Sequence, residues 1–279
     1  MDWPKNTIHW TENNKAFVSV PFTWNLPEAF STCVDYKQRG YEVHAGGPAT
    51  VLIPEVLKDV AIIGESINAL PLHNSNATRF STGCVNNCPF CAVKKIEGDL
   101  QERRGDPNPI VCDNNLFACS RKHFDWVIDT LKPVPEIDFN QGLDCRLINA
   151  HHIERLQELD IKYIRFSWDY LAEEPFVMDA ISRIRTAGYP KDKIRIYGLF
   201  NFFNEVTGKG DTQEDTTYRF RTLKKMGIVL NPMRYQPLDT LKRDSYVSPL
   251  WIRGELKRFT RYWNRANWLG GIDYAKFRG

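Results

Sequence analysis

The sequence lacks the features that mark membrane, secreted and fibrous proteins. It has no apolar run long enough to cross a bilayer, and residues 1–5 do not resemble the start of a secretory signal peptide. It has no low-complexity segment and no internal repeat beyond alternating strand and helix patterns. Its seven cysteines are an odd number in a long chain, which disfavours a disulfide framework. We therefore expect a cytoplasmic, reducing location and no membrane partner.

The composition is that of an ordinary globular protein, but its charge is unevenly distributed. Hydrophobic residues make up 42% and charged residues 25% of the 279 residues, enough for one large α/β domain or two modest ones. The net charge is +3, whereas the segment from residue 240 onward holds nine basic and three acidic residues, a net of +6. This asymmetry predicts an anionic partner or substrate near the C-terminus.

Three of the cysteines lie close together in the sequence. Cys84, Cys88 and Cys91 form a C-x3-C-x2-C motif. Three thiolates at this spacing can hold three corners of a cubane iron–sulfur cluster. No fourth cysteine lies close by, so one iron would remain open to bind another molecule. Zinc is the alternative, although its sites usually take two separated ligand pairs and no second pair follows Cys91; the histidines that could complete one are His123, His151 and His152.

This motif, with the aromatic Phe90 just before the last cysteine, resembles the signature of the radical SAM superfamily. The resemblance implies a [4Fe-4S] cluster on Cys84, Cys88 and Cys91, with S-adenosylmethionine (SAM) chelated at the open iron and Phe90 packed on its adenine. It implies reductive cleavage of SAM to methionine and a 5′-deoxyadenosyl radical that abstracts hydrogen from a substrate. An external reductant such as flavodoxin or ferredoxin would supply the electron. The cofactor carries the chemistry, and no residue is singled out as a general base or radical relay.

From about residue 76 onward, strand-like apolar runs alternate with amphipathic helix patterns. Asn149 is a predicted helix N-cap, and Thr212 with Asp215 predicts a capping box for a helix that ends at Gly227. The alternation predicts an α/β fold with a parallel sheet and right-handed crossovers. The family resemblance implies that the six units form a partial, open (β/α)6 TIM-like barrel, with its chemistry at the carboxyl ends of the strands. The predicted strands are Ala77–Ser81, Pro109–Cys112, Ile137–Asn140, Tyr163–Phe166, Ile194–Phe200 and Ile228–Leu230, and the other predicted helices are Lys122–Leu131 and Glu174–Gly188.

The N-terminal part follows a different pattern. It predicts strands at Phe17–Val20, Tyr41–Ala45 and Ala61–Gly64 and a helix at Pro27–Gln38. The run Gly40–Pro48 resembles the cobalamin-binding region of B12-type radical SAM proteins, but the D-x-H-x-x-G signature is missing, and His9 and His44 lack its context. We expect a half-Rossmann-like α/β segment that caps the barrel and extends its sheet. The predicted domains are this segment at 1–72, the radical SAM core at 73–238 and a basic aromatic C-terminal helix and tail at 239–279.

Polar residues after the second and third predicted strands are candidates for SAM contacts. Asp113, Asn114 and Asn115 stand where the family carries a Gly-Gly-Glu-like element for the SAM amino group, and they resemble the D-[DN]-N variant of B12-type members. The alternative is an Asx-turn. Residues 141–147 resemble a Q-G-L-D-x-R segment of the same subgroup, in which Gln141 and Arg146 would bind the cofactor. Arg146 has the planar fork that clamps a carboxylate or phosphate, or it pairs with Asp144 within the loop.

The next two predicted strands also end in polar residues. The resemblance places SAM carboxylate or ribose contacts at Arg165 and Ser167, unless Arg165 points outward from the sheet. Asn201 would lie on the adenine or ribose side. Three further cysteines lie near strand ends, Cys112, Cys119 and Cys145. Their alternative roles are to ligate a second cluster, to donate a hydrogen atom to a product radical, or to act as small buried hydrophobes. Cys33 is predicted to lie in the core.

The C-terminal segment combines its positive charge with aromatic residues. Arg258, Arg261 and Arg265 recur at the spacing of one helix face, and residues 258–265 resemble the R-F-x-R-W-x-N-R tail of a phage-associated radical SAM subgroup. Such a segment can track phosphates and stack bases, or it is an amphipathic helix with a solvated basic face. The interleaved aromatics are Tyr246, Trp251, Phe259, Tyr262, Trp263, Trp268 and Tyr274.

These features predict a radical SAM enzyme that modifies a nucleotide or nucleic-acid base. One alternative is a radical SAM enzyme that acts on a small metabolite or a peptide. The other is a non-catalytic nucleic-acid-binding protein, stabilised by a metal or cluster.

Overall fold

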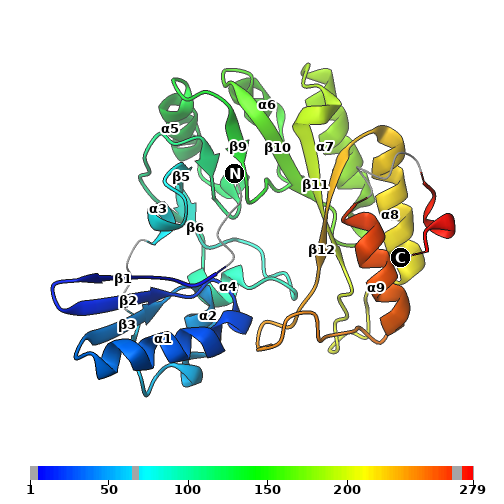
Figure 1. Cartoon of the computed structure of the whole chain (residues 1–279). Coiled ribbons are helices and arrows are strands. Elements are labelled where there is room, and N and C mark those ends of the chain that lie inside the picture. Colours follow the sequence, from blue (N-terminus) through cyan, green and yellow to red (C-terminus); the bar gives the residue numbers. More distant parts are fainter. Residues whose placement is uncertain (1–5, 65–68, 266–271, 279) are drawn as a thin grey trace. The chain divides into compact units, whose positions relative to one another are not determined.

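The computed structural model describes residues 6–64, 69–265 and 272–278, and its contacts divide them into two compact units (Figure 1). Unit 1 comprises the described residues of Met1–Ala77, Ala92–Gly98 and Gln236–Tyr246, and unit 2 comprises those of Thr78–Cys91, Asp99–Tyr235 and Val247–Gly279. The predicted domain boundaries remain predictions. No helix in the described ranges is long and apolar enough to span a membrane. Trp268 of the predicted aromatic tail lies outside the described residues.

Unit 1 contains its own four-stranded sheet in the order β1-β2-β3-β4, in which β2, β3 and β4 are parallel and β1 is antiparallel to β2. The predicted strands and helix are confirmed. The prediction that this segment extends the sheet of the barrel is wrong, because its strands form a separate sheet in which β1 pairs along the whole of β2 and takes the edge beside β2. The elements are β1 Ile8–Glu12, β2 Lys15–Ser19, α1 Leu26–Gln38, β3 Glu42–Gly46, α2 Pro48–Leu52, β4 Ile62–Ile63, α3 Leu70–His73 and α4 Val93–Glu97.

Strand β1 was not predicted, although the sequence holds a signal for it. Asn13 and Asn14 join β1 to β2 with φ of 46° and 62°. A two-residue hairpin loop with positive φ at both positions matches the right-handed twist of its strands, and asparagine tolerates that conformation. The Asn-Asn pair between two alternating segments is therefore a hairpin signal.

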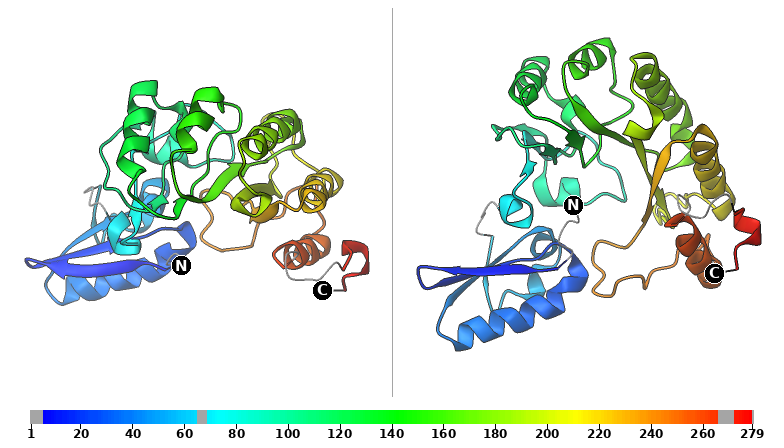
Figure 2. Two further views of the ribbon diagram at one scale, coloured as in Figure 1. Left: turned by 90° about the horizontal axis from the view of Figure 1, so that it is seen from above. Right: turned by 45° about the horizontal axis from the view of Figure 1, so that its top comes forward.

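Unit 2 is built on a six-stranded sheet in the order β12-β11-β10-β9-β8-β5, and its neighbours from β8 to β12 pair in parallel. Helices α5 to α8 lie on one side of this sheet (Figures 1 and 2). The predicted α/β alternation and parallel sheet are confirmed. The elements are β5 Ala77–Thr78, β6 Ser81–Thr82, β7 Gln101–Glu102, β8 Ile110–Val111, α5 Arg121–Leu131, β9 Ile137–Phe139, α6 Ala150–Leu156, β10 Ile161–Ser167, α7 Glu174–Thr186, β11 Ile194–Phe200, α8 Gln213–Met226, β12 Val229–Arg234 and α9 Arg253–Trp263.

The core of unit 2 lies between the sheet and these helices. Along β10 and β11, every second residue is fully buried, as in Ile164, Phe166, Ile194 and Ile196, because successive side chains of a strand point to opposite faces. Gly198 lets α8 approach β11, since a Cβ there would lie 2.4 Å from the ring of Phe220. The helices cover the sheet with stripes at helical spacing, such as Val177, Ala180, Ile181 and Ile184 of α7.

The helix ends are set by local side-chain bonds that were visible in the sequence. Asn149 accepts a hydrogen bond from the backbone of His152 and begins α6. Thr212 and Asp215 form the predicted capping box of α8, which ends at Gly227 in the left-handed conformation. These predictions are confirmed.

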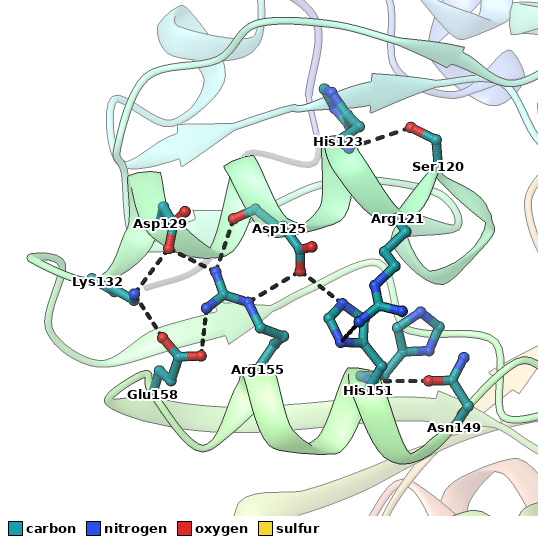
Figure 3. A network of polar contacts seen from close by, with 11 residues as sticks. Ser120, Arg121, His123, Asp125, Asp129, Lys132, Asn149, His151, Arg155 and Glu158 are labelled. Carbon is teal, nitrogen blue, oxygen red and sulfur yellow. Dashed lines mark hydrogen bonds and ion pairs between the residues drawn. The ribbon is translucent and has the colours of Figure 1, made fainter.

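A polar network links α5 to α6 on the outside of unit 2 (Figure 3). Arg155 pairs with Asp125, Asp129 and Glu158, with N···O distances of 3.1, 2.6 and 2.5 Å. His151 also contacts Asp125. Several of these carboxylates are partly exposed, so each pair contributes modestly, but together they fix the two helices side by side.

The C-terminal helix α9 packs with α8 against the same covered face of the sheet. Phe259 contacts Phe200, Phe220 and Trp251, and its side chain is fully buried. Arg258 is not part of a basic stripe, because its guanidinium donates to the carbonyls of Tyr274 and Phe277 and holds the chain end. Most of the interleaved aromatics that the structure describes are therefore core. The buried ones are Trp251, Phe259, Tyr262, Trp263 and Tyr274, whereas Tyr246 is only partly buried.

Candidate functional site

A buried aspartate shapes the entry to the cysteine loop. Asp113, which is 3% exposed, accepts hydrogen bonds from the Phe80 backbone at 3.0 Å and from Ser81 Oγ at 2.5 Å. The predicted strand Ala77–Ser81 is therefore wrong in its second half: β5 ends at Thr78, and Ser81 belongs to β6, which pairs with β7. Burial raises the pKa of Asp113 to about 6, against the opposing effect of these hydrogen bonds. In this structure Asp113 fixes Phe80 and Ser81, the two residues just before the cysteine loop, through these hydrogen bonds.

The three motif cysteines follow on one half-buried loop of unit 2. Cys84 Sγ accepts a contact from the Asn86 backbone at 3.4 Å and from Asn115 Nδ2 at 3.7 Å. The backbone N–H of Cys91 donates to the carbonyl of Cys88 at 3.0 Å. Burial raises the pKa of Cys88 to about 11, and the positive charge of Arg146 opposes this rise. The negative charges of Cys91 and Cys84 add to the rise in the pKa of Cys88.

Asp144 connects the cysteine loop to the loops that follow β8 and β9. Its Oδ2 accepts from Asn86 Nδ2 at 2.8 Å and from Asn115 Nδ2 at 3.2 Å, and its two oxygens receive the Arg146 fork at 2.8 Å each. Burial acts to raise the pKa of Asp144, but the hydrogen bonds from Arg146 and Asn86 hold it below its usual value. The sequence marked Asp144 as one of the polar residues after the third predicted strand and as a partner of Arg146, but it gave no signal for the links to the two asparagines.

Asn115 is left with one unused polar atom. Its side chain is buried and its Nδ2 points to Asp144 and Cys84, while Oδ1 has no hydrogen-bond partner among the described residues. An unpaired buried acceptor is costly and favours a ligand that donates a hydrogen bond. Of the three residues predicted for the SAM amino group, Asn115 is the one with this property.

A second group of charges lies near Cys88 at the end of β10. Burial raises the pKa of Glu173 to about 7, with a further rise from the nearby Asp169. Glu173 accepts a hydrogen bond from the Asp169 backbone at 2.8 Å, and the negative charge of Glu173 contributes to a raised pKa of Arg146. Arg219, fully buried, pairs with Asp211 at 2.8 Å and donates to the carbonyls of Trp168 and Leu199. Neither Glu173 nor Arg219 carried a recognisable motif.

The remaining predicted SAM residues are spread over the strand ends of unit 2. Phe90 is half-buried and meets Phe202 edge-on at 5.4 Å. Gln141 is exposed. Ser167 contributes a hydrogen bond to Asp169. Asn201 is buried with φ of 68° and accepts a hydrogen bond from the Ser248 backbone. In this structure it therefore also ties the end of β11 to the segment around Ser248.

Arg165 lies on the sheet face opposite the helices, and its fork is largely occupied. It donates to both oxygens of Asp138 at 2.6 Å and to Tyr197 Oη at 3.1 Å. Tyr197 in turn donates to the Asn140 carbonyl at 2.6 Å. This chain of bonds crosses three neighbouring strands, β9, β10 and β11.

The other cysteines and histidines do not join the motif. Burial raises the pKa of Cys112, Cys119 and Cys145 to about 12, which keeps these thiols protonated at neutral pH. His123 bonds to the Phe80 carbonyl, and His152 stacks on Phe117 at 4.3 Å. Within residues 6–64, 69–265 and 272–278, no group of three or more His, Cys, Asp or Glu stands close enough to hold a metal ion.

No model of a known protein family matches the chain, and no curated protein sequence matches it. Among solved structures, the chain is similar to TsrM from Kitasatospora setae, a radical S-adenosylmethionine methyltransferase with cobalamin and a [4Fe-4S] cluster bound, with a TM-score of 0.59 and 10% sequence identity. The similarity covers 80% of this chain and 65% of that one, so the chain spans just under two thirds of its length. At this identity the similarity shows a shared α/β fold.

Proposed function

We propose that the chain is a radical SAM enzyme in which Cys84, Cys88 and Cys91 ligate a [4Fe-4S] cluster. The observation that carries the proposal is the C-x3-C-x2-C loop, which hydrogen bonds tie to Asn115 and Asp144 beyond the carboxyl ends of β8 and β9. Three soft thiolates without a fourth are the donor set for a cluster with one open iron. The fold shared with a radical SAM enzyme supports the proposal.

The proposal includes the barrel fold of unit 2 and the reductive cleavage of SAM. We infer that the sheet of unit 2 forms a partial (β/α)6 barrel, which would place the site at the carboxyl ends of its strands. When bound, a reduced cluster would supply the electron that cleaves SAM to methionine and a 5′-deoxyadenosyl radical. Cobalamin is not part of the proposal, because His9 bonds to Tyr36 and His44 to Glu42 within unit 1.

The chain's own residues would bind and orient SAM. The unpaired Oδ1 of Asn115 suits an ammonium group, which only donates. Arg146 stabilises the thiolate form of Cys88 that ligation requires. Arg165 retains N–H groups beyond those given to Asp138 and Tyr197. The further SAM contacts that we propose are Phe90, Asp113, Asn114, Gln141, Ser167 and Asn201.

We propose a nucleotide or nucleic-acid base as the substrate, with a reductant such as flavodoxin or ferredoxin as the partner. The support is the positive charge after residue 240, since Arg253, Lys257 and Arg261 are exposed and recur every four residues along α9. The aromatics of this helix add no support, because they are buried. A small metabolite or peptide is the alternative substrate.

Anaerobic turnover with SAM and dithionite tests the proposal. The reconstituted protein should release 5′-deoxyadenosine and methionine, and Cys88→Ala should abolish this release. Cys33→Ala, which removes a buried thiol of unit 1, is the matched control and should retain it. A protein that holds iron or zinc tightly, but releases neither product and unfolds when metal is removed, would instead be the non-catalytic metal-stabilised binding protein.

A further inference from the structure

The six-stranded sheet of unit 2 has one face that its helices do not cover. On this face, Tyr163, Arg165, Ser167, Arg195 and Tyr197 are only partly buried, although β10 and β11 are interior strands. Parallel sheets normally bury both faces, and their strands then read as continuous apolar runs. A polar, only partly buried face in the middle of such a sheet therefore indicates a place where a ligand is expected.

Some polar groups of this face have hydrogen-bond partners within the described residues, and others have none. Asp138, Arg165 and Tyr197 bond to one another and to the Asn140 carbonyl. Arg195 has no such partner in the part of the chain that the structure describes. It is the register neighbour of Arg165, its guanidinium lies 3.7 Å above the ring centroid of Tyr163, and its buried Nε meets no acceptor among the described residues.

A second unpaired donor lies nearby on the same face. Asn231 of β12 is the register neighbour of Tyr197, and its buried Nδ2 also lacks a partner in the described part of the chain. Along β9 to β12 as described, the charged side chains of this face are Asp138, Arg165 and Arg195, a net of +1. Because both unsatisfied groups donate and the uncompensated charge is positive, the missing group must accept hydrogen bonds and carry negative charge.

We propose that this open sheet face binds an anionic group, a phosphate or a carboxylate, of a small-molecule ligand, with Arg195 as its principal contact and Asn231 as a second donor. Tyr163 would hold the guanidinium flat beneath the anion, since a planar cation stacks on an aromatic ring. The site shares its face with Arg165 and Ser167, but it uses no cysteine and needs no cluster, so it goes beyond the proposed function and its test does not depend on a reconstituted cluster.

Calorimetric titration of the full chain at low ionic strength tests this site, with inorganic phosphate in one arm and malonate in the other. One of the two should bind saturably, and the tighter one identifies the anion. Arg195→Met should weaken that binding at least about tenfold, and Arg195→Lys should weaken it less, because it keeps the charge but loses the fork.

Two controls locate the effect. Arg183→Met removes an arginine of α7 whose partner is Asp179, and Lys122→Met removes an exposed cation of α5. Both should keep the wild-type affinity within about twofold. The proposal is wrong if Arg195→Met binds as the wild type does, if Lys122→Met causes the same loss, or if neither anion binds saturably.

Discussion

The two faces of the six-stranded sheet in unit 2 differ in what completes them. On the covered face, Ile164, Phe166, Ile194 and Ile196 are buried by the chain's own helices. On the open face, Arg165 and Tyr197 bond across strands while Arg195 and Asn231 keep unpaired donors. The side chains of the covered face are therefore buried by contacts within the chain. The open face keeps polar groups that a bound ligand could satisfy. Changes on the first should alter stability, and changes on the second should alter binding.

The largest expected effect is on the covered face. Phe166→Ala should lower the free energy of unfolding by about 3–5 kcal/mol, because it removes a fully buried ring and leaves a cavity. Ser167→Ala, one residue along and on the open face, should cost about 1 kcal/mol or less. Urea unfolding of both variants checks the contrast, and equal losses would show that the two faces do not differ in this way.

A pH-dependent effect of intermediate size is expected from Glu173. Its folded pKa of about 7 lies above its ordinary value of 4.5, mainly because it is buried. The folded state therefore binds more protons, so this contribution is complete below about pH 4.5 and is lost as the pH rises through 7. The loss amounts to roughly 3 kcal/mol. Glu173→Gln cannot ionise, so its stability should fall less than that of the wild type between pH 5 and about pH 8 in urea unfolding. An unchanged slope would contradict the shift.

A smaller effect on stability is expected from Asp144→Asn. The variant loses the charge that receives Arg146 while it keeps one oxygen for Asn86 or Asn115, which should cost about 1–3 kcal/mol. It should also shorten the time for which a reconstituted cluster survives an iron chelator, because the cysteine loop loses its tie. Asp179→Asn, in an exposed pair with Arg183, is the control and should change neither quantity. Equal cluster lifetimes in all three proteins would remove Asp144 from the site.

The smallest effect on stability is expected on the exposed side of α9. Arg261→Gln should change the free energy of unfolding by less than about 0.5 kcal/mol. If this helix contacts nucleic acid, the salt dependence of single-stranded oligonucleotide binding should fall by roughly one phosphate contact. Arg258→Gln should instead destabilise the chain end, because Arg258 holds two carbonyls. Oligonucleotide binding that is independent of salt would count against a nucleic-acid substrate.

Much of the fold of unit 2 was readable from local patterns. The strand Ile194–Phe200 and the cap residues Asn149, Thr212 and Asp215 depend on nearest neighbours in sequence, so their signals survive without knowledge of the fold. The end of β5 at Thr78 did not, because Asp113, 33 residues beyond Phe80, takes the backbone group that would continue the strand.

The candidate site was predictable in its cysteines but not in its supports. The thiol spacing is a motif within one loop, whereas the links from Asp144 to Asn86 and Asn115 join residues 58 and 29 positions apart. The unpaired donor of Arg195 likewise appears only once the neighbouring strand sets its register. Long-range pairing of single polar side chains leaves no pattern in the sequence.

The most direct test of the radical SAM proposal is the electron paramagnetic resonance spectrum of the reconstituted, reduced protein with and without SAM. We expect a reduced cubane signal that shifts when SAM is added, is absent in Cys88→Ala and is retained in Cys33→Ala. A cubane signal that SAM leaves unchanged, or stoichiometric zinc in place of a cluster, would contradict the proposal.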